Sequence, residues 1–102
     1  MATIKLRSQR YPQYTELKLL ISHVMENGRN RDADGQLITA HFIQQLQISC
    51  NGEPVISLDM AGSIARNPFF TLRLKTTRPG DVITVSWQDN QLQHDSLEHI
   101  IQ

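Results

Sequence analysis

The chain has 102 residues, and its ten Lys and Arg residues balance ten Asp and Glu residues, with four His and one Cys. This length allows one small domain with a sizeable core and excludes a second domain. The formal charge of zero predicts no basic face of the strength that phosphate neutralisation needs, which argues against general binding to nucleic acid or anionic lipid.

Apolar and polar residues alternate along most of the chain, which is the pattern of half-buried strands. After an N-terminal strand, the pattern predicts a strand over residues 17–25 with these residues on one face: Leu17, Leu19, Ile21, His23 and Met25. Leu20 and Val24 lie on its opposite face. Because both faces are apolar, we expect this strand to be central in its sheet.

The next two runs, 42–50 and 54–60, are separated by Asn51-Gly52. Asn and Gly adopt positive φ readily, so these runs are predicted to form a hairpin, with Cys50 pointing inward. Segment 61–68 either forms one helical turn before Pro68 or crosses between sheets as a loop.

Two further strands are predicted over 69–76 and 82–88, joined at Arg78-Pro79-Gly80-Asp81 by a type II turn. Asp89-Asn90 marks another reversal. A capping-box pattern at 95–98 could begin a helical turn, but too few residues follow, and a C-terminal strand is favoured. The count reaches about seven strands, which predicts an all-β, immunoglobulin-like antiparallel β-sandwich in a single domain over 1–102.

Several motifs resemble catalytic or metal sites without completing them. Asn30, Asp32, Asp34 and Gly35 have EF-hand spacing, but position twelve is His41 rather than Glu. Other incomplete sets are a copper-type group (His23, Met25, Cys50, Met60) and a hydrolytic group (His94, Asp95, Ser96, His99). The sequence therefore predicts no catalytic residue, no metal and no cofactor.

Cys50 cannot form an intrachain disulfide because it is the only Cys. An inert buried thiol is favoured, and an intermolecular disulfide stays open as an alternative.

The longest polar stretch is the loop of residues 25–36. Loops of this length in small domains are commonly binding loops, although a merely tolerated insertion is an equal alternative. The residues predicted to bind a partner are Met25, Asn27, Arg29, Arg31, Asp32 and Asp34.

Several blocks, taken in order, resemble the signature of the SoxZ family. They are LISHVMENG (20–28), RDADGQLI (31–38), NGEPV (51–55), ARNPFF (65–70), GD (80–81) and SW-DN around Gln88. The chain departs from the family pattern at Val24 and Thr39, where Pro is common, and neither change removes a chemical group.

The resemblance implies an immunoglobulin-like fold and a non-catalytic subunit of the SoxYZ carrier of thiosulfate oxidation. It implies a heterodimer with SoxY, whose Gly-Gly-Cys-Gly-Gly arm carries the sulfur, and transient contacts with other Sox enzymes. The N-terminus shows no signal peptide and by itself suggests a cytosolic protein. The resemblance instead implies the periplasm, reached by co-export with SoxY. The alternative is a free-standing sandwich that binds a small ligand or metal through the 25–36 loop.

Overall fold

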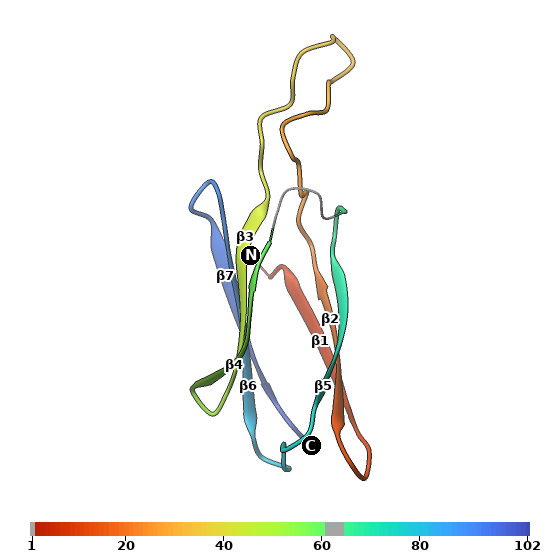
Figure 1. Cartoon of the computed structure of the whole chain (residues 1–102), viewed down its shortest axis with the longest axis vertical. Helices are drawn as coiled ribbons and strands as arrows, with labels where there is room; N and C mark the ends of the chain where they lie inside the picture. The colour runs from red at the N-terminus through yellow and green to blue at the C-terminus, as the bar shows by residue number, and fades with distance from the viewer. Residues whose placement is uncertain (1, 61–64) are drawn as a thin grey trace.

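The computed structural model describes residues 2–60 and 65–102. Within them the chain forms seven strands and no helix (Figure 1). The strands are β1 (Ile4–Arg10), β2 (Thr15–Ile21), β3 (Ile43–Cys50), β4 (Glu53–Asp59), β5 (Phe69–Leu74), β6 (Val82–Asp89) and β7 (His94–Ile100). The predicted C-terminal strand is confirmed as β7.

The strands form two antiparallel sheets that pack as a sandwich. One sheet has the order β1-β2-β5 and the other the order β4-β3-β6-β7. The predicted all-β antiparallel sandwich is therefore confirmed, and so is the central place of β2. This strand ends at Ile21 rather than at residue 25, but burial still alternates beyond it, because His23 and Met25 are 8% and 6% exposed.

The predicted turns connect strands in two different ways. Asn51 and Gly52 have φ values of 52° and 86°, and they close the β3–β4 hairpin as expected. Gly80 has a φ of 94°, and the Asp81 amide donates to the Arg78 carbonyl oxygen at 3.1 Å, as in a type II turn. This second turn lies between β5 and β6, so it carries the chain from one sheet to the other. The alternatives for segment 61–68 fall partly outside the described residues.

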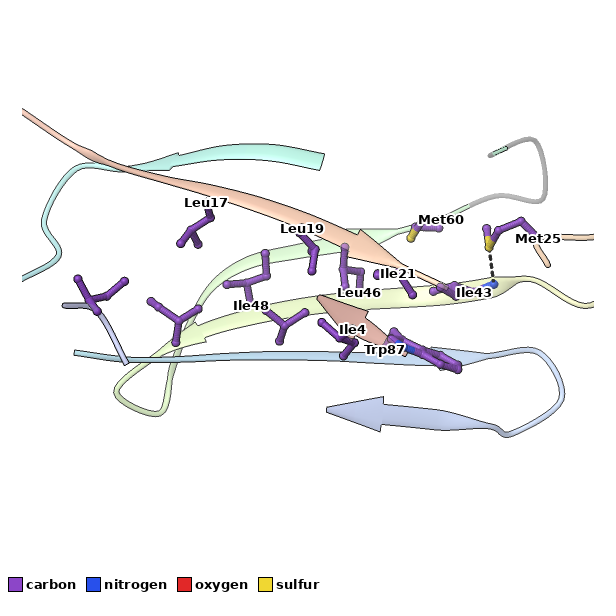
Figure 2. Packing of buried hydrophobic residues seen from close by; sticks show 13 residues of the cluster. Ile4, Leu17, Leu19, Ile21, Met25, Ile43, Leu46, Ile48, Met60 and Trp87 are labelled. Carbon is purple, nitrogen blue, oxygen red and sulfur yellow. Dashed lines mark hydrogen bonds between the residues drawn. The ribbon is translucent and has the colours of Figure 1, made fainter. Parts of the chain in front are cut away.

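The core lies between the two sheets and takes one face of each strand (Figure 2). Its fully buried members include Leu17 and Leu19 of β2, and Leu46 and Ile48 of β3. Because alternate side chains of a strand point to opposite faces, this single core explains the period-two pattern of the sequence.

The molecule is elongated, with extents of 53 × 22 × 22 Å. The segment between β2 and β3 projects beyond the sandwich at the top of Figure 1. Among the described residues, none belongs to a helix that could cross a membrane.

Candidate functional site

The projecting segment is a hairpin rather than an open loop. Glu26 and His41 exchange two backbone hydrogen bonds of 2.7 Å each, and Arg31 forms a second antiparallel bridge with Leu37. We call residues 26–41 the protruding hairpin. It is longer than the predicted 25–36 loop because residues 37–41 form its returning side.

Local hydrogen bonds explain the turn at its tip. Asp32 Oδ1 accepts from the amides of Asp34 and Gln36, at 2.9 and 3.0 Å. Arg31 Nη1 donates to the carbonyl oxygen of Gly35 at 2.7 Å. The EF-hand-like spacing therefore reflects a turn in which a carboxylate oxygen already accepts from two backbone N–H groups.

The two sides of the hairpin approach closely at Gly28. A Cβ atom at Gly28 would lie 3.1 Å from Ala40 Cβ, and the φ of Gly28 is 84°. Both the close approach and the positive φ favour glycine at this position.

The residues predicted to bind a partner divide into two groups. Arg29, Arg31, Asp32 and Asp34 are exposed and Asn27 is half-buried, all within the protruding hairpin. Met25 instead belongs to the core, where its Sδ accepts from the Ile43 amide at 3.4 Å (Figure 2). The side chain of Met25 thus continues the inward face of β2, so it differs from the other five residues in lying inside the protein.

A cluster of two imidazoles and one carboxylate, of which only the His41 ring is partly exposed, lies where the hairpin meets the sandwich. His23 Nε2 lies 3.0 Å from Asp89 Oδ2, and His41 Nε2 lies 2.7 Å from the same oxygen. The two imidazole rings pack edge to face at 4.7 Å, and the His23 ring packs in the same way on Trp87 at 5.2 Å. The cluster joins the segment between β2 and the hairpin, the last residue of the hairpin and β6.

Hydrogen bonds fix the roles of the atoms in this cluster. The Met25 amide donates to His23 Nδ1 at 3.0 Å, so the His23 proton lies on Nε2 and is donated to Asp89. Asp89 Oδ1 accepts from the amides of Gln91 and Gln93, at 3.0 and 2.8 Å. The fully buried carboxylate therefore accepts four hydrogen bonds.

These contacts determine the ionisation of Asp89. Burial on its own would raise the pKa of the Asp89 carboxyl, because the charged form loses hydration. The hydrogen bonds from His23, Gln93, His41 and Gln91 outweigh burial and hold this pKa below its ordinary value. The carboxylate is thus charged at neutral pH although it is buried.

His23, His41 and Asp89 each offer a ligand atom, and these three atoms lie within 4.8 Å of one another. Two His and one carboxylate can bind a transition metal. A His that binds through Nε2 normally donates its Nδ1–H to a neighbouring acceptor, but His23 Nδ1 faces the amide N–H of Met25. The three residues therefore form a hydrogen-bonded connection between hairpin and sandwich, and their geometry fits this role better than that of a metal centre. We call this connection the His23–His41–Asp89 lock.

The other incomplete motifs are dispersed. Asp95 Oδ2 accepts from the amide and hydroxyl of Thr3, at 2.9 and 2.7 Å. His99 Nε2 lies 2.7 Å from Ser8 Oγ. Asp95 thus connects β7 to Thr3, which directly precedes β1, and His99 connects β7 to β1. The two residues are not assembled into a catalytic group around Ser96.

Cys50 lies at the end of β3 that is remote from the protruding hairpin. Its half-buried side chain packs against the core, and Sγ lies 3.9 Å from Asp81 Oδ2. Burial, and then the negative charge of Asp81, raise the pKa of the Cys50 thiol. A raised pKa disfavours the reactive thiolate.

The roles of His41 and Asp89 do not follow from their spacing, because the two residues are 48 residues apart. The sequence pattern places Asp89 in a reversal and His41 only at position twelve of the EF-hand-like spacing. One signal was present for Asp89, because it continues the inward series Ile83, Val85 and Trp87 of β6. A charged residue on a core-facing position requires buried partners, and that requirement could have drawn attention to His23.

Comparison with known families agrees with the resemblance. A family model described as "Sulphur oxidation protein SoxZ" matches residues 4–99. A search of curated proteins finds no match. The family match includes the first six strands, the protruding hairpin and all of β7 except its last residue.

Proposed function

Because this chain belongs to the SoxZ family of sulphur oxidation proteins, we propose that it is the non-catalytic scaffold subunit of the SoxYZ carrier complex. In this role it pairs with SoxY, which carries the covalently bound sulfur intermediates of thiosulfate oxidation on its own cysteine. The observation that supports the proposal most strongly is the family match over residues 4–99.

The protruding hairpin is the segment we assign to recognition, either of SoxY or of the enzymes that its arm visits. It projects beyond the sandwich, and Arg29, Arg31, Asp32 and Asp34 expose charges of both signs. Charges of mixed sign favour correct orientation and fast association more than high affinity. The His23–His41–Asp89 lock supports this role by fixing the direction of the hairpin relative to both sheets.

The periplasm is the compartment we propose, with co-export on SoxY as the route. The family resemblance supports it, since the sulfur carrier works there. A fractionation experiment with and without the SoxY gene tests this point directly. Periplasmic accumulation that persists without SoxY would contradict co-export.

Co-expression with a neighbouring SoxY-like chain that ends in Gly-Gly-Cys-Gly-Gly tests the pairing. The two chains should elute together at micromolar concentration with the mass of a heterodimer. A stable specific interface buries roughly 1,200–2,000 Å² in total, so the complex should survive purification. Persistent separation of two folded chains would refute the proposal.

A further inference from the structure

The charged residues of this neutral protein are segregated between the two sheets. Strands β3, β4, β6 and β7 contain no Lys or Arg. Strands β1, β2 and β5 contain five: Lys5, Arg7, Arg10, Lys18 and Arg73. Their only carboxylate belongs to Glu16. The formal charge of zero is therefore the sum of two sheets of opposite character.

Four of these five residues lie on the outer face of the three-stranded sheet, and the exception is Arg10, which shares the phase of the inward Ile4 and Leu6. Arg7 of β1 lies directly opposite Lys18 of β2 in the register. Like charges at such positions destabilise a sheet. Lys18 Nζ lies 3.9 Å from Glu16 Oε1, and the Lys18 side chain remains 56% exposed. Glu16 thus compensates this pair only weakly.

A shallow hollow of about 220 Å³ lies among these side chains. It is lined by Arg7, Ser8, Gln9, Glu16 and Lys18. Two cations therefore border a space that a ligand group can enter. Arg73, on the neighbouring strand, stacks over the Tyr14 ring at 4.9 Å and is already engaged.

An apolar patch lies next to the basic pair on the same face. Leu20 is paired with Lys5 on one side and with Phe69 on the other, and Phe69 is 59% exposed. Leu20 is two residues beyond Lys18, which corresponds to about 7 Å along the strand. The face thus presents cations and an exposed aromatic ring side by side.

We propose that this outer face docks a protein surface that carries clustered carboxylates next to an apolar or aromatic side chain. Carboxylates would neutralise the opposed pair of Arg7 and Lys18, and the apolar group would cover Phe69. Charge complementarity of this kind favours association and orientation, while an aromatic contact contributes affinity. This inference does not require the heterodimer proposed above, and it uses no residue of the protruding hairpin.

Two other occupants fit the face less well. Nucleic acid requires a longer track of cations, and here Leu20, two residues beyond Lys18, and its register partner Phe69 interrupt the cations. A second copy would have to offer its acidic sheet. There the exposed Glu53 and Asp59 lie on one edge strand and Glu98 on the other, with uncharged Gln and Ser residues between them.

The test uses the full chain and two soluble probes, poly-L-glutamate and a random copolymer of glutamate and tyrosine. We expect both to bind at low ionic strength, the copolymer more tightly, with NMR shifts at Lys5, Lys18 and Phe69. The double variant Arg7→Gln/Lys18→Gln should weaken binding about fivefold to tenfold, as expected for two partly exposed ion pairs. Phe69→Ser should remove the preference for the copolymer.

The matched control is Arg29→Gln/Arg31→Gln, which removes the same charge from the protruding hairpin and should leave probe binding unchanged. Equal weakening by both double variants would overturn the proposal, because it would indicate a general charge effect. Tighter binding to a DNA duplex than to the copolymer would overturn it in favour of nucleic acid. Concentration-dependent self-association that Arg7→Gln/Lys18→Gln abolishes would overturn it in favour of a second copy.

Stability provides an independent readout. Removal of the opposed like charges should leave the melting temperature of Arg7→Gln/Lys18→Gln unchanged or slightly raised. A marked loss of stability would contradict the proposal, since it would show that this pair supports the fold rather than a partner.

Discussion

Asp89 joins two parts of the molecule that are distant in sequence. It is fully buried, and its four hydrogen bonds come from the imidazoles of His23 and His41 and from two amides of the β6–β7 turn. Replacement of Asp89 by Asn keeps the side-chain shape, but it places an NH₂ group, itself a donor, against N–H groups that also donate. We expect Asp89→Asn to lower the free energy of unfolding by about 3 kcal/mol, measured by denaturant titration.

The exposed Asp59→Asn is the matched control, with an expected change of under about 0.5 kcal/mol. The pH dependence gives a second measurement. Because the folded pKa of Asp89 is lowered, its contribution is present above the ordinary carboxyl pKa of about 3.9 and is lost as pH falls through the folded value. Wild type should therefore lose more stability than Asp89→Asn below about pH 4. If the stabilities of wild type and Asp89→Asn fall in parallel at acid pH, Asp89 is not the source of the pH dependence.

Cys50 is the natural candidate for a direct role in sulfur chemistry, because it is the only cysteine of the chain. Its raised pKa and its contact with the core both argue against a nucleophilic role. Cys50→Ser should therefore preserve thiosulfate-dependent turnover in a system reconstituted with SoxY. A stability loss of about 1 kcal/mol is expected because a hydroxyl replaces a thiol at a largely apolar position.

Partner exchange by the wild-type complex under reducing and oxidising conditions tests an intermolecular disulfide at Cys50. Equal exchange under both conditions is expected. Lost turnover in a Cys50→Ser protein that folds and still binds SoxY would instead assign this thiol a chemical role.

The protruding hairpin is the element that we expect to carry recognition. Arg29 and Arg31 are exposed, so Arg29→Glu/Arg31→Glu should change the free energy of unfolding by under about 0.5 kcal/mol per site. Association with SoxY, or turnover by a docking enzyme, should weaken and become less dependent on salt. Surface plasmon resonance over a range of ionic strengths measures both effects.

A control with the same charge change is Arg10→Glu/Lys75→Glu, because both residues are exposed at the opposite end of the three-stranded sheet. It should leave the affinity for SoxY near that of wild type. If the hairpin variant also associates and supports turnover as wild type does, the hairpin is a tolerated insertion and recognition lies on a sheet face.

At the scale of the whole molecule, the structure divides into a sandwich and a projection that meet at the Glu26–His41 pair. Residues 29–39 are all exposed, so they add little to the core. Replacement of residues 27–40 by Asn-Gly would leave this pair closed by a two-residue hairpin turn. The shortened protein should unfold cooperatively, with a melting temperature within about 5 °C of wild type.

Thermal unfolding followed by circular dichroism measures this division, and binding to SoxY should be lost in the same protein. Failure of the shortened chain to fold, while Arg29→Glu/Arg31→Glu folds normally, would show that the projection is needed by the sandwich. The His23–His41–Asp89 lock remains intact in the shortened protein, because none of its three residues lies in the replaced segment 27–40.

Most of the fold could be predicted from the sequence because each strand places one face in a single core. Alternation therefore located the strands, and Asn51-Gly52 and Pro79-Gly80 located turns that depend on local geometry. The hairpin could not be recognised, because residues 27–40 lack alternation and are held by a few backbone hydrogen bonds. The lock was missed for a different reason: Asp89 lies 48 residues from His41 and 66 from His23, and spacing along the chain carries no information at such separations.

The segregation of charge has a consequence for what an approaching molecule experiences. The two sheets of a sandwich lie about 10 Å apart, whereas the Debye length at physiological ionic strength is about 8 Å. For a molecule at one outer face, the charges of the other face are therefore largely screened. Such a molecule meets either a cationic surface or an anionic one. The isoelectric point near 6.9 reflects the summed charge of both faces, so it does not describe the charge of either face.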